Sequence, residues 1–217
     1  MREKIIQNMK EKKIITIIRG LEPAICLKLA EALYEGGINM IEVTFEQTSQ
    51  NGWRDTREAI SSMAAAFSGK VFVGAGTVLT KEQVRLAKAA GAGYMIAPSV
   101  NPEVISYAKE QGLVSIPGAM TPTEVVTAYE AGADFVKLFP AGTLGPDYMK
   151  AIKAPLSHIP LLAVGGITEG NLEAFLKAGA AGAGIGGSLA NREWIAANRF
   201  DKVTELAKRY TEIAARA

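Results

Sequence analysis

The chain has 217 residues, of which 48% are hydrophobic and 21% are charged, a composition that is typical of one compact domain and excludes a disordered or fibrous chain. Its formal net charge is +2, with acidic and basic residues dispersed, so no basic block predicts a nucleic-acid or membrane surface. A single cysteine, Cys26, frequent charges near the start and the lack of a long apolar run exclude an internal disulfide, a signal peptide and a membrane span. We therefore expect a cytoplasmic protein of one domain, residues 1–217, with neither nucleic acid nor membrane as a partner.

The predicted elements begin with a short amphipathic helix over residues 3–12 and end with a helix over residues 200–215. Between them, eight apolar segments recur, each followed by an amphipathic helical segment. Their starts lie roughly 20 to 32 residues apart, which is the spacing of strand–helix units in a parallel sheet. The segments are IITIIR from Ile14, NMIEVT from Asn39, VFVGAG from Val71, YMIAP from Tyr94, VSIP from Val114, DFVKLF from Asp134, LLAVGG from Leu161 and GAGIGG from Gly182.

Local signals mark where the helices between these strands begin and end. Two pairs match capping boxes, Thr80 with Gln83 and Thr121 with Glu124, and prolines 102 and 122 suit first helical positions. Glycines at expected helix ends predict left-handed caps, at Gly36, Gly91, Gly112, Gly132 and Gly179. The pattern predicts an α/β fold, a (β/α)8 TIM barrel with an extra N-terminal helix, and an open doubly wound sheet is the alternative.

Polar side chains gather at the carboxyl ends of the predicted strands, where such barrels place their chemistry. Arg19 ends the first strand, Glu42 lies in the second, Thr77 follows the third and Lys137 lies within the sixth. Side chains alternate between the two faces of a strand. If the faces that carry Arg19, Glu42 and Lys137 point inward, these three side chains converge.

Lys137 is the most informative residue, because a lysine in an apolar strand suffers desolvation unless it is neutral or paired. Lowering its pKa toward neutrality costs roughly 4 to 5 kcal/mol of charge stabilisation but yields a free amine that can attack a ketone. The alternatives are an edge lysine that reaches solvent or a structural salt bridge with Glu42. The acid and the arginine at neighbouring strand ends favour the catalytic interpretation.

Glu42 and Thr77 each have a functional and a structural interpretation. A carboxylate beside Lys137 can move the protons that imine formation and carbon–carbon cleavage require, or Glu42 is a solvated charge at a strand end. The Thr77 hydroxyl faces the site, or it caps the helix that begins near Thr80.

Two glycine clusters follow the last two strands, Gly165-Gly166 and Gly186-Gly187-Ser188. Backbone amides can approach an anion closely there, so we expect a phosphate site, with ordinary turns as the alternative. The GxGxxG pattern at Gly182 is a weak dinucleotide signal, because no strand–helix–strand unit follows it. His158 is the only histidine, and no cluster of metal ligands is apparent.

Taken in order, several motifs resemble the family of 2-keto-3-deoxy-6-phosphogluconate (KDPG) and 4-hydroxy-2-oxoglutarate aldolases over nearly the whole chain. They are IIR around Arg19, EGGINMIEVTF around Glu42, VGAGTV around Thr77, IPGAMTPTE around Pro117, DFVKLFPA around Lys137, VGGI at Gly165 and GIGGS at Ser188.

The resemblance implies a class I aldolase in which Lys137 forms the Schiff base and Glu42 is the general acid/base. It implies that Arg19 and Thr77 lie near the pyruvyl carboxylate, and it implies a homotrimer with no metal or organic cofactor. The expected partner is a keto-acid phosphate. The residues expected to bind it are Arg19, Thr77, Pro117, Gly165, Gly166, Gly186, Gly187 and Ser188.

Three positions depart from the family pattern. Glu46 stands where several members carry an arginine that assists the substrate carboxylate, Val164 where many have a threonine, and Gly142 where a glutamate often follows the FPA motif. These changes leave the Schiff-base residues intact and bear on substrate preference. The expected reaction is cleavage of KDPG to pyruvate and glyceraldehyde 3-phosphate, with 4-hydroxy-2-oxoglutarate as a further substrate. The alternatives are a sugar-phosphate epimerase, a thiamine-phosphate synthase relative or a non-catalytic trimeric scaffold.

Overall fold

The computed structural model describes residues 1–217, apart from the side chains of residues 50 and 51. All its strands run parallel in one sheet of order β5-β4-β3-β2-β1-β9-β8-β7-β6. The strand bounds are β1 Ile14–Ile18, β2 Met40–Thr44, β3 Phe72–Gly76, β4 Tyr94–Ile96, β5 Val114–Ile116, β6 Gly118–Ala119, β7 Val136–Leu138, β8 Leu161–Val164 and β9 Gly182–Ile185.

Strands β5 and β6 together form the fifth strand of the barrel, which Pro117 divides. The expected fifth segment, residues 114–117, contains β5, and β6 lies beyond it. The first half pairs with β4 and the second with β7. The backbone of the next segment bonds to both halves, since Phe135 N donates to Ser115 O at 3.4 Å and Phe139 N donates to Ala119 O at 3.0 Å. The sheet therefore closes on itself as an eight-stranded barrel, which excludes the open doubly wound sheet.

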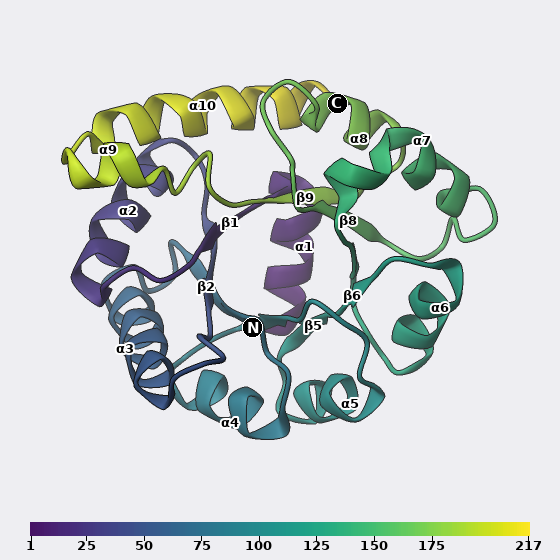
Figure 1. The fold of residues 1–217 in the computed structure, drawn as a ribbon, viewed down its shortest axis with the longest axis horizontal. Coiled ribbons are helices and arrows are strands. Elements are labelled where there is room, and N and C mark those ends of the chain that lie inside the picture. Colours follow the sequence, from purple (N-terminus) through teal and green to yellow (C-terminus); the bar gives the residue numbers. More distant parts are fainter.

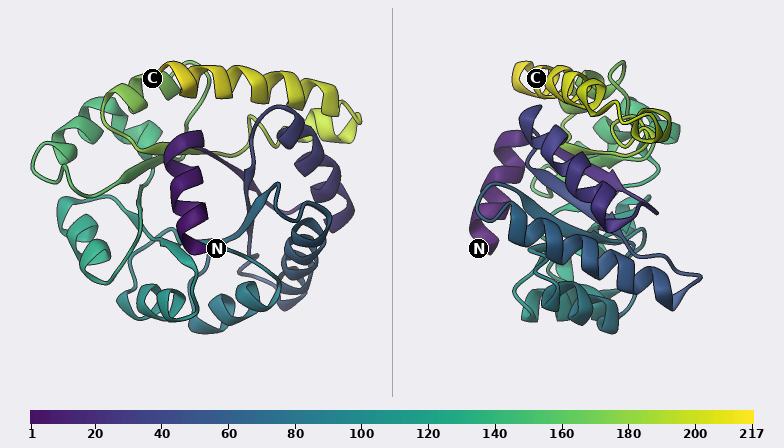
Figure 2. Two further views of the ribbon diagram at one scale, coloured as in Figure 1. Left: turned by 180° about the vertical axis from the view of Figure 1, so that it is seen from behind. Right: turned by 90° about the vertical axis from the view of Figure 1, so that its left-hand side faces the viewer.

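Helices surround this barrel in a ring, as Figure 1 shows down its axis. Their bounds are α1 Arg2–Lys12, α2 Pro23–Glu35, α3 Gln50–Ala66, α4 Lys81–Ala89, α5 Pro102–Glu110, α6 Pro122–Glu130, α7 Ala141–Lys153, α8 Leu172–Lys177, α9 Arg192–Ala196 and α10 Phe200–Arg216. Helix α1 is the exception to the ring, because it lies across one end of the barrel (Figure 2). No described helix is long and apolar enough to cross a membrane.

The strands alternate between two apolar layers. Outward side chains pack against the helices, whereas inward ones fill the barrel with a second cluster that includes Ile15, Met40 and Phe135. Ile5 and Met9 of α1 are fully buried against this inner cluster and close the barrel from below. The expected inward faces of β1, β2 and β7 are thus confirmed.

The predicted helix signals are confirmed with one exception. Both capping boxes form, and prolines 102 and 122 stand at the start of their helices. Glycines 91, 112, 132 and 179 have positive φ, but the prediction for Gly36 is wrong, since its φ is −80° and Gly37 takes the left-handed conformation at 89°. A Cβ on Gly36 would lie 2.3 Å from that of Ala207, so this glycine lets α2 and α10 approach closely.

Candidate active site

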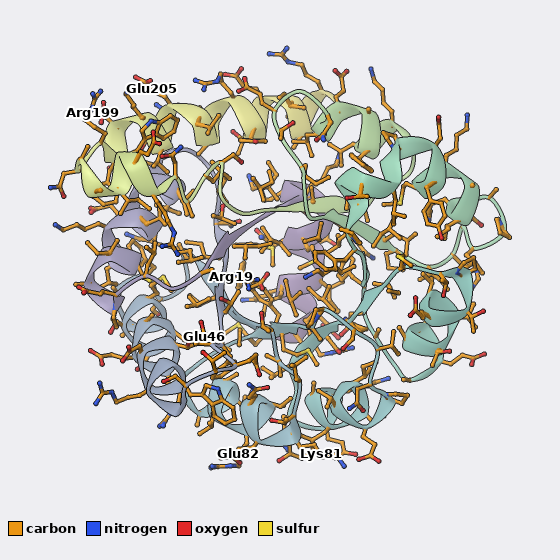
Figure 3. The ribbon with its side chains drawn as sticks, in the orientation of Figure 1. Arg19, Glu46, Lys81, Glu82, Arg199 and Glu205 are labelled. Atoms are coloured by element: carbon orange, nitrogen blue, oxygen red, sulfur yellow. The ribbon has the colours of Figure 1, made fainter. Side chains whose placement is uncertain are left out.

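A cavity of about 1030 Å³ opens at the carboxyl ends of the strands. Figure 3 shows Arg19 over the middle of this end of the barrel. The expected site residues that line the cavity are Arg19, Glu42, Thr77, Lys137, Gly165, Gly166, Gly186, Gly187 and Ser188. Pro117 is not among the described lining residues. It is buried, and its contribution is the carbonyl that holds the Lys137 amide.

Lys137 extends from β7 into this cavity, with its Nζ 4.7 Å from the centre of the Phe139 ring. The residue is 8% exposed, so its amine does not extend into bulk solvent. Burial lowers the pKa of Lys137, the Glu42 carboxylate opposes this shift and the Arg19 charge adds to it. Among the described side chains, no ion pair joins Lys137 to Glu42. The environment thus shifts Lys137 toward the neutral amine that a nucleophile requires.

Glu42 extends inward from β2 and is 2% exposed, so it is not a solvated charge at a strand end. Burial raises its pKa from 4.5 to about 7, against the opposing pull of Lys137 and then Arg19. Glycine at position 76 makes room for the carboxylate, because a Cβ there would lie 1.7 Å from Glu42 Oε1. A carboxyl with a pKa near neutrality can both donate and accept protons in one reaction cycle.

Thr77 follows β3 with φ of 55°, a left-handed conformation that is strained for a β-branched residue. The side chain of Gln47 supports this turn by donating to Thr77 O at 2.9 Å. Thr80, and not Thr77, caps α4, so the structural alternative for Thr77 is wrong. Its position on the cavity wall leaves the residue available to a ligand.

Arg19 lies between two hollows, the main cavity and a neighbouring one of about 470 Å³ that it shares with Glu46. The Glu46 carboxylate accepts hydrogen bonds from Thr48 N at 3.1 Å and Thr48 Oγ1 at 3.0 Å, which lower its pKa, with a smaller contribution from Arg19. Figure 3 shows Glu46 on the α3 side of Arg19. The departure at position 46 therefore places a carboxylate, and not a further cation, in the hollow beside Arg19.

The turn after β8 is built from glycines with positive φ, 89° at Gly165 and 76° at Gly166. The start of α7 packs directly on it, since Gly142 N donates to Gly165 O at 2.7 Å. A Cβ on Gly142 would lie 2.7 Å from Gly166 O. The departure at position 142 thus permits a close contact that any side chain would prevent, and Val164, buried just before the turn, contributes an apolar wall.

The turn after β9, the strand that pairs with β8, places Ser188 on the adjacent part of the cavity wall. Its Oγ lies 3.0 Å from the Tyr210 hydroxyl of α10, and Leu189 N donates to Gly186 O at 3.1 Å. A hydroxyl has one donor and two acceptor sites. Ser188 can therefore keep its bond to Tyr210 and still bind a phosphate oxygen.

Sequence reasoning missed Arg192, the first residue of α9, which also lines the cavity. Its Nη2 donates to the carbonyl of Arg19 at 3.3 Å, so it joins the last loop of the barrel to the first. The available signal was its position four residues after Ser188. Among the described residues, no group of three His, Cys, Asp or Glu side chains could hold a metal ion.

A buried lysine and a buried carboxyl of raised pKa at the mouth of a (β/α)8 barrel are the groups that a class I, Schiff-base-forming aldolase requires. The particular family follows from comparison with known proteins. The model of the "KDPG and KHG aldolase" family matches residues 5–206, and the chain belongs to that family.

Relatives and solved structures agree with this assignment. The chain is 38% identical to the 2-dehydro-3-deoxy-6-phosphogalactonate aldolase of Escherichia coli K12 over 81% of its length and 83% of the relative. It is 33% identical to the 2-dehydro-3-deoxy-phosphogluconate aldolase of Treponema pallidum, over 96% and 97%. The KDPG aldolase of Legionella pneumophila, solved with pyruvate captured at low pH as a covalent carbinolamine intermediate, matches with a TM-score of 0.83 and 28% identity over 96% and 97% of the two chains.

A thiamine phosphate pyrophosphorylase from Pyrococcus furiosus also matches, with a TM-score of 0.71, 21% identity and coverage of 95% and 97%. That likeness shows a shared fold. The match therefore supports the architecture that the thiamine-phosphate synthase alternative shares with this chain, and it does not support the chemistry of that alternative.

Proposed function

We propose that the protein cleaves a 2-keto-3-deoxy-6-phosphosugar acid to pyruvate and glyceraldehyde 3-phosphate, as a homotrimer that uses no metal or organic cofactor. The observation that carries the proposal is the Lys137–Glu42 pair, buried together in a cavity large enough for a six-carbon acid phosphate. Two relatives at 38% identity act, by name, on the phosphogalactonate acid or are probable enzymes of that kind. We therefore place this C4 epimer first, KDPG second and 4-hydroxy-2-oxoglutarate third.

The geometry supports a two-stage reaction. Lys137 Nζ attacks the C2 ketone, and the carbinolamine loses water, with Glu42 supplying the proton that the leaving hydroxyl requires. Glu42 then removes the proton of the C4 hydroxyl, the C3–C4 bond breaks and its electron pair passes into the enamine as the aldehyde leaves. Protonation at C3 and hydrolysis of the imine release pyruvate and restore the free amine. Arg19 and Thr77 hold the carboxylate throughout.

The far end of the cavity suits the phosphate. Gly165, Gly166, Gly186 and Gly187 expose backbone there, and the Ser188 hydroxyl adds a donor. Arg192 supplies a positive charge on the same rim. Val164 has no hydroxyl to bond the phosphate, unlike the threonine that many family members have at this position. The site therefore depends on backbone groups, Ser188 and Arg192.

Removing the Ser188 hydroxyl tests the phosphate assignment. We expect Ser188→Ala to lower kcat/KM for both six-carbon acid phosphates by roughly tenfold or more, since a hydrogen bond to a charged group is worth about 1.5 to 3 kcal/mol. Activity on 4-hydroxy-2-oxoglutarate, which has no phosphate, should be unaffected. Steady-state kinetics on the three substrates measures this.

The matched control is Ser106→Ala, which removes a serine that bonds to Ala131 O on the outer face of α5. It should leave all three values unchanged. Equal losses on phosphorylated and unphosphorylated substrates in Ser188→Ala would show that the turn after β9 is only structural.

Replacing Arg192 tests the cation that sequence reasoning missed. Arg192→Gln should raise KM for the acid phosphates about tenfold or more, because a guanidinium contributes charge as well as hydrogen bonds to phosphate. The rate at which pyruvate forms its imine should stay the same. Arg199→Gln is the control, since Arg199 lies at the outer edge of the molecule (Figure 3), outside the cavity, and pairs with Asp201 at the start of α10. Similar KM values in both variants would remove Arg192 from the site.

A further inference from the structure

Inside the barrel, one side chain from each of the two strands that flank β3 extends over β3. Glu42 of β2 occupies the space above Gly76, and the Tyr94 ring of β4 occupies that above Gly74, where a Cβ would lie 2.2 to 2.5 Å from ring atoms. Glycines 74 and 76 are adjacent inward positions of one strand, separated by about 6.5 to 7 Å. The Glu42 carboxyl and the Tyr94 ring therefore occupy neighbouring positions over a stretch of β3 that has no side chains of its own.

Both groups are enclosed and incompletely bonded. Tyr94 is 0% exposed and Glu42 is 2% exposed, and among the described side chains Tyr94 OH and Glu42 Oε2 are buried polar atoms with no hydrogen-bond partner. Buried polar atoms of this kind are rare, and each calls for an explanation. An apolar phenylalanine would fill the same space in the inner cluster without that cost, so the hydroxyl has a use beyond packing.

The charged and titratable groups around Glu42 determine the protonation state of that hydroxyl. Lys137 of β7 and Arg19 after β1 are the charged groups that lower the pKa of Glu42, and both approach from the cavity side. On β4, Tyr94 is the titratable group, and Glu42 is the charge that, after burial itself, raises the pKa of Tyr94. The phenol thus stays protonated and available as a donor toward the carboxylate.

We propose that Tyr94 is a positioning residue for Glu42, whose hydroxyl donates through one enclosed water to Glu42 Oε2 and fixes the carboxylate toward Lys137. The two atoms are not directly bonded in the structure, and a buried water needs two to four polar partners such as these. The effect of Tyr94 on catalysis rests on the proposed function, in which Glu42 is the general acid/base. The link supports the ionised state of Glu42, which must accept the C4 hydroxyl proton before cleavage.

The test is a titration of Glu42 in the parent and in Tyr94→Phe. The side-chain carboxyl carbon of Glu42, assigned by its loss in Glu42→Gln, is followed by NMR in protein labelled with ¹³C at glutamate. We expect the pKa of Glu42 to rise by about one unit in Tyr94→Phe, because the donor to the charged form is lost. The acidic limb of kcat/KM against pH should move upward by a similar amount, with Lys137 still trapped by pyruvate and borohydride.

The control is Thr16→Val, which removes another buried hydroxyl without a described partner, on the face of β1 that points away from the barrel interior. It should leave the titration unchanged. Should Tyr94→Phe fold poorly, fluorinated tyrosine at position 94 is a stronger donor and should lower the pKa of Glu42.

Coincident titrations for the parent and Tyr94→Phe, or no shift with fluorinated tyrosine, overturn the positioning role. A parent that forms no imine with pyruvate instead contradicts the proposed function, and the NMR titration reads the Tyr94 link in either case.

Discussion

Replacing Lys137 with alanine is expected to abolish cleavage, with kcat lower by on the order of 10⁴-fold or more, because no other group can form the imine that accepts the electron pair. In the parent, borohydride reduction with pyruvate should leave a pyruvyl adduct on the peptide that contains Lys137. Peptide mass mapping measures the adduct, and single-turnover kinetics measures the loss.

Lys153 provides the matched control for this experiment. Burial also lowers its pKa, but its Nζ donates to Ser157 O and Ile159 O, both at 2.8 Å, at the end of α7. It should carry no adduct. An adduct on Lys153, or comparable cleavage by Lys137→Ala, would contradict the Schiff-base mechanism.

Glu42→Gln is expected to keep the fold and bind pyruvate but to lower kcat about 100- to 10,000-fold, the usual contribution of a positioned proton shuttle. The amide preserves shape without basicity. Glu46→Gln is the control, because that carboxylate lies in the neighbouring hollow and is bonded to Thr48. Near-normal turnover in Glu42→Gln would make Glu42 a structural neighbour of Lys137 only.

The same substitution should change how stability depends on pH. The pKa of Glu42 is raised to about 7 in the folded protein, so the folded state binds this proton more tightly than the unfolded state does. Its contribution to stability is complete below about pH 4.5 and is lost as pH rises toward about 7, by roughly 3 kcal/mol. Denaturant unfolding across this range should show the loss in the parent and not in Glu42→Gln.

Much of the fold could be predicted because its signals are local. Capping boxes at Thr80 and Thr121 depend on residues three apart in the sequence. The alternation of side chains along a strand was enough to predict that Glu42 and Lys137 point inward. The division of the fifth strand at Pro117 was not predictable in this way. It depends on which neighbours each half meets when the barrel closes.

The missed features of the site share one physical origin, which is contact between segments distant in sequence. Gly36 was expected to cap α2 by conformation, whereas its actual role is set by Ala207. Arg192 belongs to the cavity because the last loop returns beside the first, and Tyr94 matters because the two glycines of β3 carry no side chains. Such contacts leave no periodic signal in the chain.

Helix α1 has a further consequence for the chemistry above it. Ile5 and Met9 exclude water from the lower end of the barrel, while Phe135 and Leu162 fill the space between that end and the reactive amine. Helix α1 therefore keeps the dielectric low beneath the active site, although it does not line the cavity. Water admitted at this end would raise the local dielectric and weaken the effect of burial that lowers the pKa of Lys137, which would favour the charged, unreactive form of the amine.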